Sequence, residues 1–296
     1  MVNIKNIIII ISFFCLWIDS FFSEKVQILV GFSLIFSLGI LHGSNDLLLI
    51  QRLNKQKNNL SYYRILSYYI LVVLAGIVCF YTIPFISLLL FILFSAYHFG
   101  EQQWKKLENQ VSKSWEVVFQ FTYGICLLLI LFNIHLKEVQ NIIYEITSVH
   151  VPTLYITLSL KIVGILLFCQ MVYLYSKVPQ LRSLLLMESF YLAVFAVIFF
   201  SSSLIWGFAI YFVLWHSVPS IIDQVEFLYP EFSLPNFLKY LKSGFVFWMA
   251  SIIGIVIIYF LFKDEKIFNA LFFSFLASIT FPHVLVILKM FHKNRE

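Results

Sequence analysis

Four of the seven histidines lie within long apolar segments of the sequence: His42, His98, His216 and His283. An ionisable side chain is costly to bury in such a segment unless it has a partner or a task. His98 shows this most clearly, because residues 85–94 before its motif carry no charge and two lysines follow the motif at 105–106. Imidazole is a ligand for Fe, Zn, Cu and Ni and binds in its neutral form, so it can be buried with a metal. The four histidines could therefore form a buried metal site.

Three acidic residues follow these histidines at spacings that could support such a site. Ligating imidazoles usually hydrogen-bond through their second ring nitrogen to a carboxylate or a carbonyl group. Asp46 follows His42 by four residues, and Glu101 follows His98 by three, so each acid could share a helical face with its histidine. Asp223 lies two helical turns beyond the third histidine, where a bent backbone could return it to the site. The same acids could instead be interfacial charges or helix caps.

Composition assigns the chain to the membrane proteins. Hydrophobic residues make up 61% of the 296 residues and charged residues 12%, with a mean hydropathy of +0.92. Soluble domains contain about 25% charged residues, so these charges are too few to cover a soluble surface. The net charge of +5 is modest and predicts no nucleic-acid partner. The four cysteines lie singly in apolar runs, and the sequence has no CxxC, no glycine-rich phosphate loop and no H-E-x-x-H motif.

Apolar segments of roughly 17–25 residues are long enough to span a membrane as helices. The sequence contains ten candidates, at about 5–22, 26–48, 62–82, 84–100, 115–136, 154–176, 183–200, 203–219, 244–262 and 267–290. Several are short or closely spaced. We therefore predict an all-α, polytopic integral membrane bundle of eight to ten transmembrane helices, with ten favoured. The whole chain, residues 1–296, is predicted to form a single membrane domain with an uncleaved first span.

The charges of the loops predict the orientation of these spans. With ten spans and both termini in the cytoplasm, fifteen of the 20 Lys and Arg residues lie on the inner side and four on the outer side, as the positive-inside rule expects. All four histidines then lie in spans that run from outside to inside, within about eight residues, or 12 Å of helix rise, of the inner end. One buried histidine alone would favour a structural hydrogen bond. Four at a common depth favour one shared site.

Four segments, read together, resemble the motifs of the Brp/Blh family of membrane β-carotene 15,15′-dioxygenases. The family pattern runs HG-x-x-D, HFG, HS-x-x-H and, near the C-terminus, PH. The matching segments are Leu41-His-Gly-Ser-Asn-Asp46, Tyr97-His-Phe-Gly100, Tyr211-Phe-Val-Leu-Trp-His-Ser217 and Phe281-Pro-His283. Their order and spacing match, and the resemblance covers about residues 30–290.

The resemblance implies an iron-dependent enzyme that uses O₂ to cleave the central double bond of β-carotene into two molecules of retinal. It places His42, His98 and His216 on iron-ligand positions. One residue departs from the pattern, because Ser220 stands where the family has its second histidine of the HS-x-x-H segment. Serine is a poor replacement for imidazole, and Pro219 is expected to disfavour helix at Val218.

The departure leaves several ligand sets open. His283 could complete a four-histidine site, Glu101 could bind the metal directly, or three histidines and water could hold it. Metal binding could also be lost. We favour His283, because its depth fits and the Pro-His step marks a local irregularity in the helix.

We therefore predict a multi-pass dioxygenase of the inner (plasma) membrane, with Fe²⁺ as cofactor and a carotenoid and O₂ as substrates. The carotenoid would enter from the lipid bilayer, and Tyr97, Trp104 and Trp215 are candidate walls of its path. Two alternatives belong to other classes. One is a non-catalytic carotenoid- or retinal-binding membrane protein, which Ser220 favours. The other is a histidine-ligated haem or electron-transfer protein, which four histidines at one depth disfavour. The sequence makes no prediction of oligomeric state.

Overall fold

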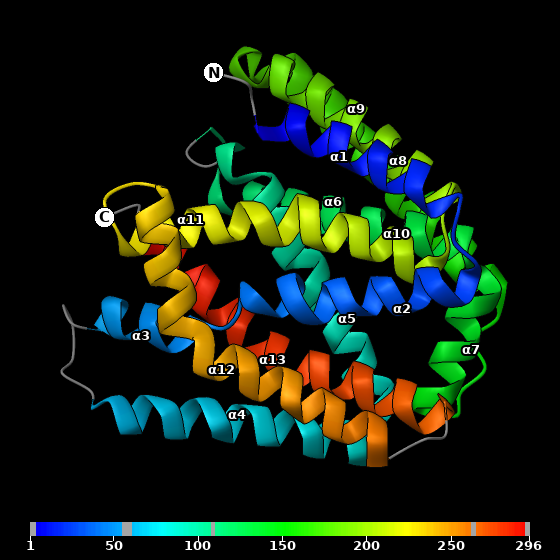
Figure 1. Cartoon of the computed structure of the whole chain (residues 1–296). Coiled ribbons are helices and arrows are strands. Elements are labelled where there is room, and N and C mark those ends of the chain that lie inside the picture. Colours follow the sequence, from blue (N-terminus) through cyan, green and yellow to red (C-terminus); the bar gives the residue numbers. More distant parts are fainter. Residues whose placement is uncertain (1–3, 55–60, 108–109, 262–264, 294–296) are drawn as a thin grey trace. The chain divides into compact units, whose positions relative to one another are not determined.

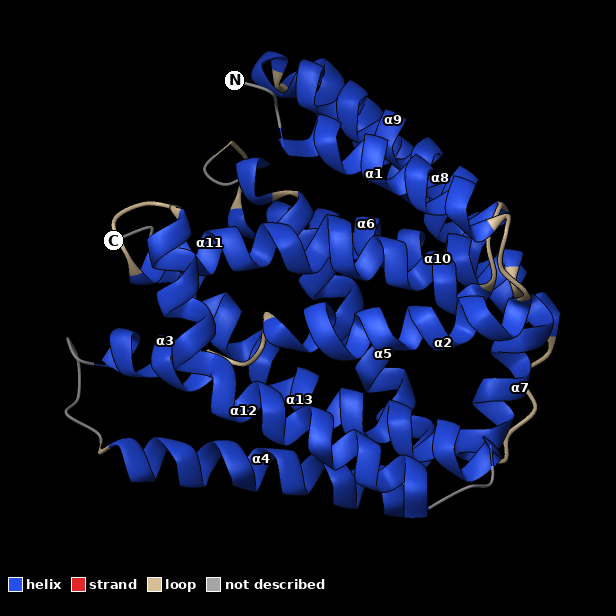
Figure 2. Ribbon diagram, viewed as in Figure 1, coloured by secondary structure: helices blue, strands red, loops and turns tan. Residues whose placement is uncertain are grey.

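Figure 1 shows a computed structural model of the chain, which describes residues 4–54, 61–107, 110–261 and 265–293. Within these ranges the regular elements are helices, and no strand is present (Figure 2). The predicted all-α class is confirmed for this part of the chain.

Most helices coincide with the apolar segments of the sequence. Their bounds are α1 (Ile4–Asp19), α2 (Glu24–Leu34), α3 (Asp46–Asn54), α4 (Tyr62–Thr82), α5 (Pro84–Gln103), α6 (Lys113–Ile134), α7 (Leu136–Thr147), α8 (Thr153–Lys177), α9 (Arg182–Phe200), α10 (Leu204–Ile210), α11 (Val218–Leu228), α12 (Leu234–Leu261) and α13 (Glu265–Lys293). Two π-helical segments, η1 (Ile35–Gly39) and η4 (Tyr211–Ser217), and two 3₁₀ turns, Lys105–Leu107 and Pro179–Leu181, complete the described elements.

Seven helical stretches of the described chain are long and apolar enough to cross a membrane, and one more apolar stretch, Ser274–Met290, is shorter. Large apolar side chains are exposed along α4, α8 and α12, including Leu71, Ile165 and Val246. Exposed apolar surface of this extent marks a face that contacts lipid. This is the pattern of a helical membrane bundle, while the count of ten spans and the cytoplasmic termini stay predictions.

One predicted span is wrong in its continuity. The segment 26–48 was expected to be a single helix, but α2 and η1 are followed by a turn at residues 42–45, and α3 begins at Asp46. Short i→i+3 bonds form this turn, from the Gly43 amide to the Ile40 carbonyl (3.1 Å) and from the Ser44 amide to the Leu41 carbonyl (3.2 Å). The Ser44 hydroxyl also donates to the Leu41 carbonyl at 2.7 Å. Local side-chain bonds of this kind compete with helix continuation.

The chain divides into two compact units. Unit 1 comprises Met1–Ser33, Ser95–Tyr144 and His150–His216, and unit 2 comprises Leu34–Phe94, Glu145–Val149 and Ser217–Glu296. The single membrane domain expected from the sequence stays a prediction.

Unit 1 is built around α6, which packs against α8, α9 and α10. The C-terminal half of α5 crosses α6 at two glycines. A Cβ atom added to Gly100 would lie 2.6 Å from the carbonyl carbon of Gln120, and one added to Gly124 would lie 2.7 Å from the carbonyl carbon of Ala96. Small residues allow helix backbones in membranes to approach this closely. The crossing fixes the stretch of α5 that carries His98.

Unit 2 is built around α13, which packs against α3, α4 and α12. Leu49, Val286, Ile287 and Met290 form one buried apolar cluster. A second cluster, formed by Leu41, Ile221, Val225 and Tyr240, joins the segment before His42 to α11 and α12. These contacts place the turn at 42–45 among three helices.

Candidate metal centre

Two of the predicted ligands form a buried pair in unit 1. His98 lies on α5 and His216 in η4, with 1% and 2% of their surfaces exposed. Their ring centroids lie 4.6 Å apart in an edge-to-face arrangement. Phe99 packs edge-on against the His216 ring at 4.7 Å, and Phe212 stacks on it at 5.6 Å. The apolar rings hold the His216 imidazole in one orientation.

The backbone around His216 is irregular, because η4 is π-helical over Tyr211–Ser217. π-Helical segments are rare in proteins, and those that occur are often found at functional sites. The Gln102 amide of α5 donates to the His216 carbonyl at 2.9 Å, which ties the two histidine-bearing segments of unit 1 together. The expectation that Pro219 disfavours helix at Val218 is wrong, because α11 begins at Val218 and holds Pro219 in its first turn. Helix continues through this proline without a break, from α10 and η4 into α11.

The other two predicted ligands form a similar pair in unit 2. The ring centroids of His42 and His283 lie 4.7 Å apart, again edge to face. The Nδ1 atom of His42 is hydrogen-bonded to the Gly39 carbonyl. Because a carbonyl only accepts, Nδ1 must carry the proton in this bond, and Nε2 then holds the lone pair of the neutral ring.

His283 follows Pro282 inside α13, and its Nδ1 atom lies 2.8 Å from Oδ1 of Asp46. An ionised Asp46 accepts this bond, so Nε2 is again the nitrogen that offers a lone pair. Oδ2 of Asp46 accepts a bond from the Tyr69 hydroxyl at 3.0 Å. The sequence suggested that Asp46 shares a helical face with His42, but the turn at 42–45 breaks that helix, and the bond goes to His283.

A buried polar network lies behind the His42 backbone. The Gln224 amide donates to the His42 carbonyl at 2.7 Å and to the Ser220 hydroxyl at 3.1 Å. The Tyr240 hydroxyl donates to Oε1 of Gln224 at 2.9 Å. None of these three side chains is more than 1% exposed. The Ser220 hydroxyl, which stands where the family pattern has a histidine, thus helps to hold the turn that carries His42.

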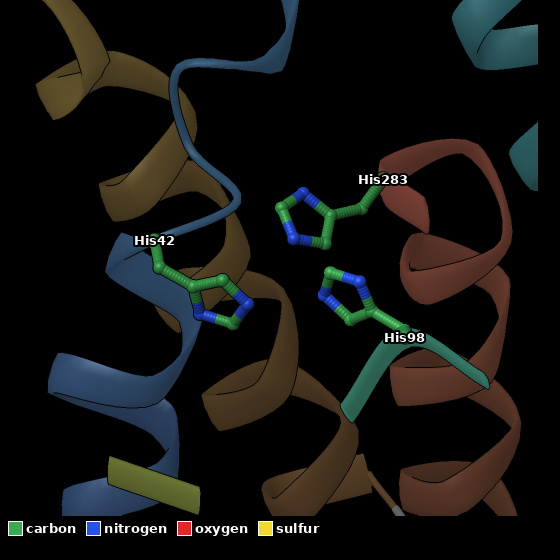
Figure 3. A group of neighbouring side chains, drawn as sticks. All are labelled: His42, His98 and His283. Carbon is green, nitrogen blue, oxygen red and sulfur yellow. The ribbon is translucent and has the colours of Figure 1, made fainter. Parts of the chain in front are cut away.

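Each pair offers imidazole nitrogens that could bind a metal ion. In unit 2 the buried rings of His42 and His283 each leave Nε2 as the nitrogen with a lone pair (Figure 3). In unit 1 the buried rings of His98 and His216 lie side by side. Neutral nitrogen donors fit Fe²⁺, and they also fit other late first-row metals.

The other two acidic residues predicted beside the histidines lie on α5 and α11. Glu101 is buried on α5, one turn after His98, and Asp223 is half-buried on α11. Their roles beside a metal stay predictions.

The three aromatic candidates for the substrate path differ in their surroundings. Trp104 is fully buried against Phe119 and Tyr123, at ring distances of 4.7 and 5.5 Å. The Trp215 ring N–H donates to the Ser12 hydroxyl at 3.0 Å within unit 1. Tyr97 is half-buried on α5. Trp104 and Trp215 thus fill helix interfaces, and contact with substrate stays a prediction for all three.

Sequence reasoning missed Gln102, Gln224, Tyr240 and Tyr69. Gln102 is adjacent to Glu101, and its place on the polar side of the HFG motif could have suggested it. The other three lie outside the motifs, and only the folded chain brings them to the histidines.

Comparison with known families agrees with the motif pattern. The family model described as β-carotene 15,15′-dioxygenase matches residues 33–291, a range that contains all four histidines and their motifs. No curated protein and no solved structure matches the chain.

Proposed function

Because the chain belongs to the β-carotene 15,15′-dioxygenase family, we propose that it is an iron-dependent membrane enzyme that cleaves a carotenoid with O₂. The proposed substrate is β-carotene or a close relative, cut at the central double bond to give retinal. The observation that carries this proposal is the coincidence of the family match with buried histidines from its motifs. The proposed location is the inner membrane, with the histidines near the cytoplasmic side.

We propose that His42, His98, His216 and His283 bind one Fe²⁺ ion. The two buried pairs of motif histidines support this set: His98 with His216 in unit 1, and His42 with His283 in unit 2. The Gly39 carbonyl and the Asp46 carboxylate hold protonated Nδ1 atoms, so His42 and His283 would bind through Nε2. When bound, ferrous iron would supply the binding and redox activation of O₂.

Ser220 is excluded from the proposed ligand set. Its hydroxyl already accepts a bond from Gln224, which also holds the His42 carbonyl. We propose that His283 takes over the duty of the missing histidine, with its ring fixed by Asp46. Glu101, buried one turn from His98, is proposed to orient the unit 1 pair.

The substrate side of the proposal follows from solubility. A C40 hydrocarbon partitions into lipid, so it would reach the site from the bilayer, past the apolar helices. Holding the central double bond beside the histidines decides where the polyene is cut. Tyr97, next to His98 in the chain and half-buried, is the aromatic residue we propose to contact the polyene first.

Expression in β-carotene-accumulating bacteria tests the proposal. We expect loss of colour, formation of retinal and about one iron per purified chain. His98→Ala should lose iron and retinal together. His150→Ala is the matched control, because His150 is exposed in the loop after α7. Full activity of His98→Ala would remove that residue from the site.

The same experiment separates the alternatives. Ser220 favours a non-catalytic carotenoid- or retinal-binding protein, which would give an iron-free preparation with unchanged pigment. Bound iron without retinal would refute the β-carotene assignment and leave the metal site standing. A Soret band would indicate haem.

A further inference from the structure

Tyr69 differs from the exposed residues beside it on its helix. It lies on α4, where Tyr63, Tyr68 and Leu71 are 77%, 59% and 63% exposed. Tyr69 is instead half-buried, and its hydroxyl donates to Oδ2 of Asp46 at 3.0 Å. An apolar side chain would serve equally well for packing in lipid. The hydroxyl therefore calls for a reason in the residue that it contacts.

That residue is a carboxylate with 1% of its surface exposed. Burying an ionised carboxylate is strongly unfavourable unless its oxygens are hydrogen-bonded or paired. Tyr69 donates to one oxygen of Asp46, and His283 Nδ1 lies 2.8 Å from the other. The carboxylate thus links α4, α3 and α13, three helices that pack on one another within unit 2.

We propose that Tyr69 is a positioning residue of the metal centre, acting on His283 through Asp46. This inference rests on the proposed function, because it assigns His283 a metal-binding duty. With both oxygens engaged, the Asp46 carboxylate cannot rotate about its terminal bond without losing a partner. The plane of the carboxylate then fixes the direction of the Nδ1–H bond, and with it the direction in which Nε2 of His283 points.

The proposal predicts a selective effect of one oxygen atom. Partners of ligating histidines contribute about 10–100-fold to metal affinity, and Tyr69 acts one bond further away. We expect Tyr69→Phe to weaken Fe²⁺ or Co²⁺ binding by about tenfold, and also to lower the thermal midpoint of the metal-free protein, because a buried carboxylate oxygen loses its donor. Tyr68→Phe is the matched control, since Tyr68 is adjacent on α4 and exposed. It should bind the metal as the unchanged chain does.

The test uses the purified full-length protein in detergent, titrated with Fe²⁺ or Co²⁺ against a chelator of known affinity. Asp46→Asn and the double variant Asp46→Asn with Tyr69→Phe complete a cycle. If Tyr69 acts through Asp46, the double variant is no worse than Asp46→Asn alone. Incorporation of 4-aminophenylalanine at position 69 keeps the ring and replaces O–H by an N–H donor. We expect this variant to bind metal within about threefold of the unchanged chain, as donor rescue requires.

Each outcome decides the matter. Equal affinities of Tyr69→Phe and Tyr68→Phe, or additive losses in the double variant, would overturn the role of Tyr69 and leave the proposed function intact. If Tyr69→Phe does not fold, a loss of more than about threefold with 4-aminophenylalanine overturns the role, and affinity within that range supports it. Absence of metal binding by the unchanged chain refutes the proposed function first, and this inference with it.

Discussion

The crossing of α5 and α6 gives the sharpest test of how the site is positioned. Gly100 of the HFG motif lies two residues after His98 and faces the backbone of α6 at Gln120. The perturbation is Gly100→Ala, which adds one methyl group. The change leaves the chemical nature of every proposed ligand untouched.

The structure gives the size of the effect. The added Cβ would lie 2.6 Å from the Gln120 carbonyl carbon and closer still to its oxygen, whereas ordinary contacts begin at 3.4 Å. The obstacle is backbone, which cannot turn aside as a side chain can. The two helices must therefore separate by at least about 0.8 Å, the difference between those two distances. Overpacking of this kind typically costs about 1–3 kcal/mol of folding stability.

The displacement should matter more for activity than for folding. A misplacement of about 1 Å in a reactive geometry can reduce the rate on the order of 100-fold. We expect Gly100→Ala to lower retinal formation by that order and to reduce iron content, in protein that still purifies as a monodisperse species. Retinal formation is measured by chromatography, iron content by elemental analysis, and stability by thermal unfolding in detergent.

Gly164→Ala is the control. Gly164 lies on α8, and a Cβ added there meets nothing within 4 Å. Alanine is the better helix former by about 0.8–1.0 kcal/mol, so this variant should be as stable as the unchanged chain or slightly more so, with full activity. Gly100→Ala with activity and stability equal to those of Gly164→Ala would refute the claim that the tight crossing positions His98.

Three further predictions concern single contacts. Ser220→His should lose about 1–3 kcal/mol of stability from overpacking a site that is 1% exposed, without a gain in iron content; a rise in iron measured per chain would show that the family geometry is still latent. Lys5→Met removes the cation 2.7 Å from the fully buried Glu188 carboxylate and should lower the free energy of unfolding by about 1–3 kcal/mol. Lys5→Arg keeps the charge and should retain most of the stability. Equal thermal midpoints for the two variants would contradict this. Treatment with an iron chelator should abolish retinal formation, and Fe²⁺ should restore it; unchanged activity in verified iron-free protein would exclude iron as the cofactor.

The helices and the histidines were accessible to sequence reasoning for physical reasons. Apolar runs mark the helices of a membrane protein, and α4 occupies the predicted residues 62–82 because Pro84 ends the helix within a longer apolar stretch. The histidines could be recognised because an ionisable side chain is unusual within an apolar segment.

The hydrogen-bond partners of the histidines could not be predicted from the sequence. Asp46 and His283 are 237 residues apart, and no local pattern announces their bond. The turn at 42–45 was missed because the predicted span joins the apolar residues on both sides of it, although Gly43, Ser44 and Asn45 are residue types that favour turns. Gln224 lies beyond the predicted span 203–219, which the structure extends as α11 to Leu228. Only the fold determines which amide reaches the His42 carbonyl.

The backbone at the histidines suggests how the site can remain precise without a rigid polar core. His42 follows a π-helical segment, His216 lies inside another, and His283 follows a proline within its helix. A π segment or an internal proline leaves carbonyl groups without their usual helical partner. At His42 and His216, a glutamine amide from another helix donates to that histidine's own carbonyl. The irregular backbone thus leaves a carbonyl group able to accept a hydrogen bond, and a glutamine of another helix donates to it at the histidine itself. His98, on regular helix, has the glycine crossing in place of such a cross-link.

We therefore expect Gln102→Leu and Gln224→Leu to lose more free energy of metal binding than free energy of unfolding. Equal losses in the two free energies would show that the glutamines serve folding alone.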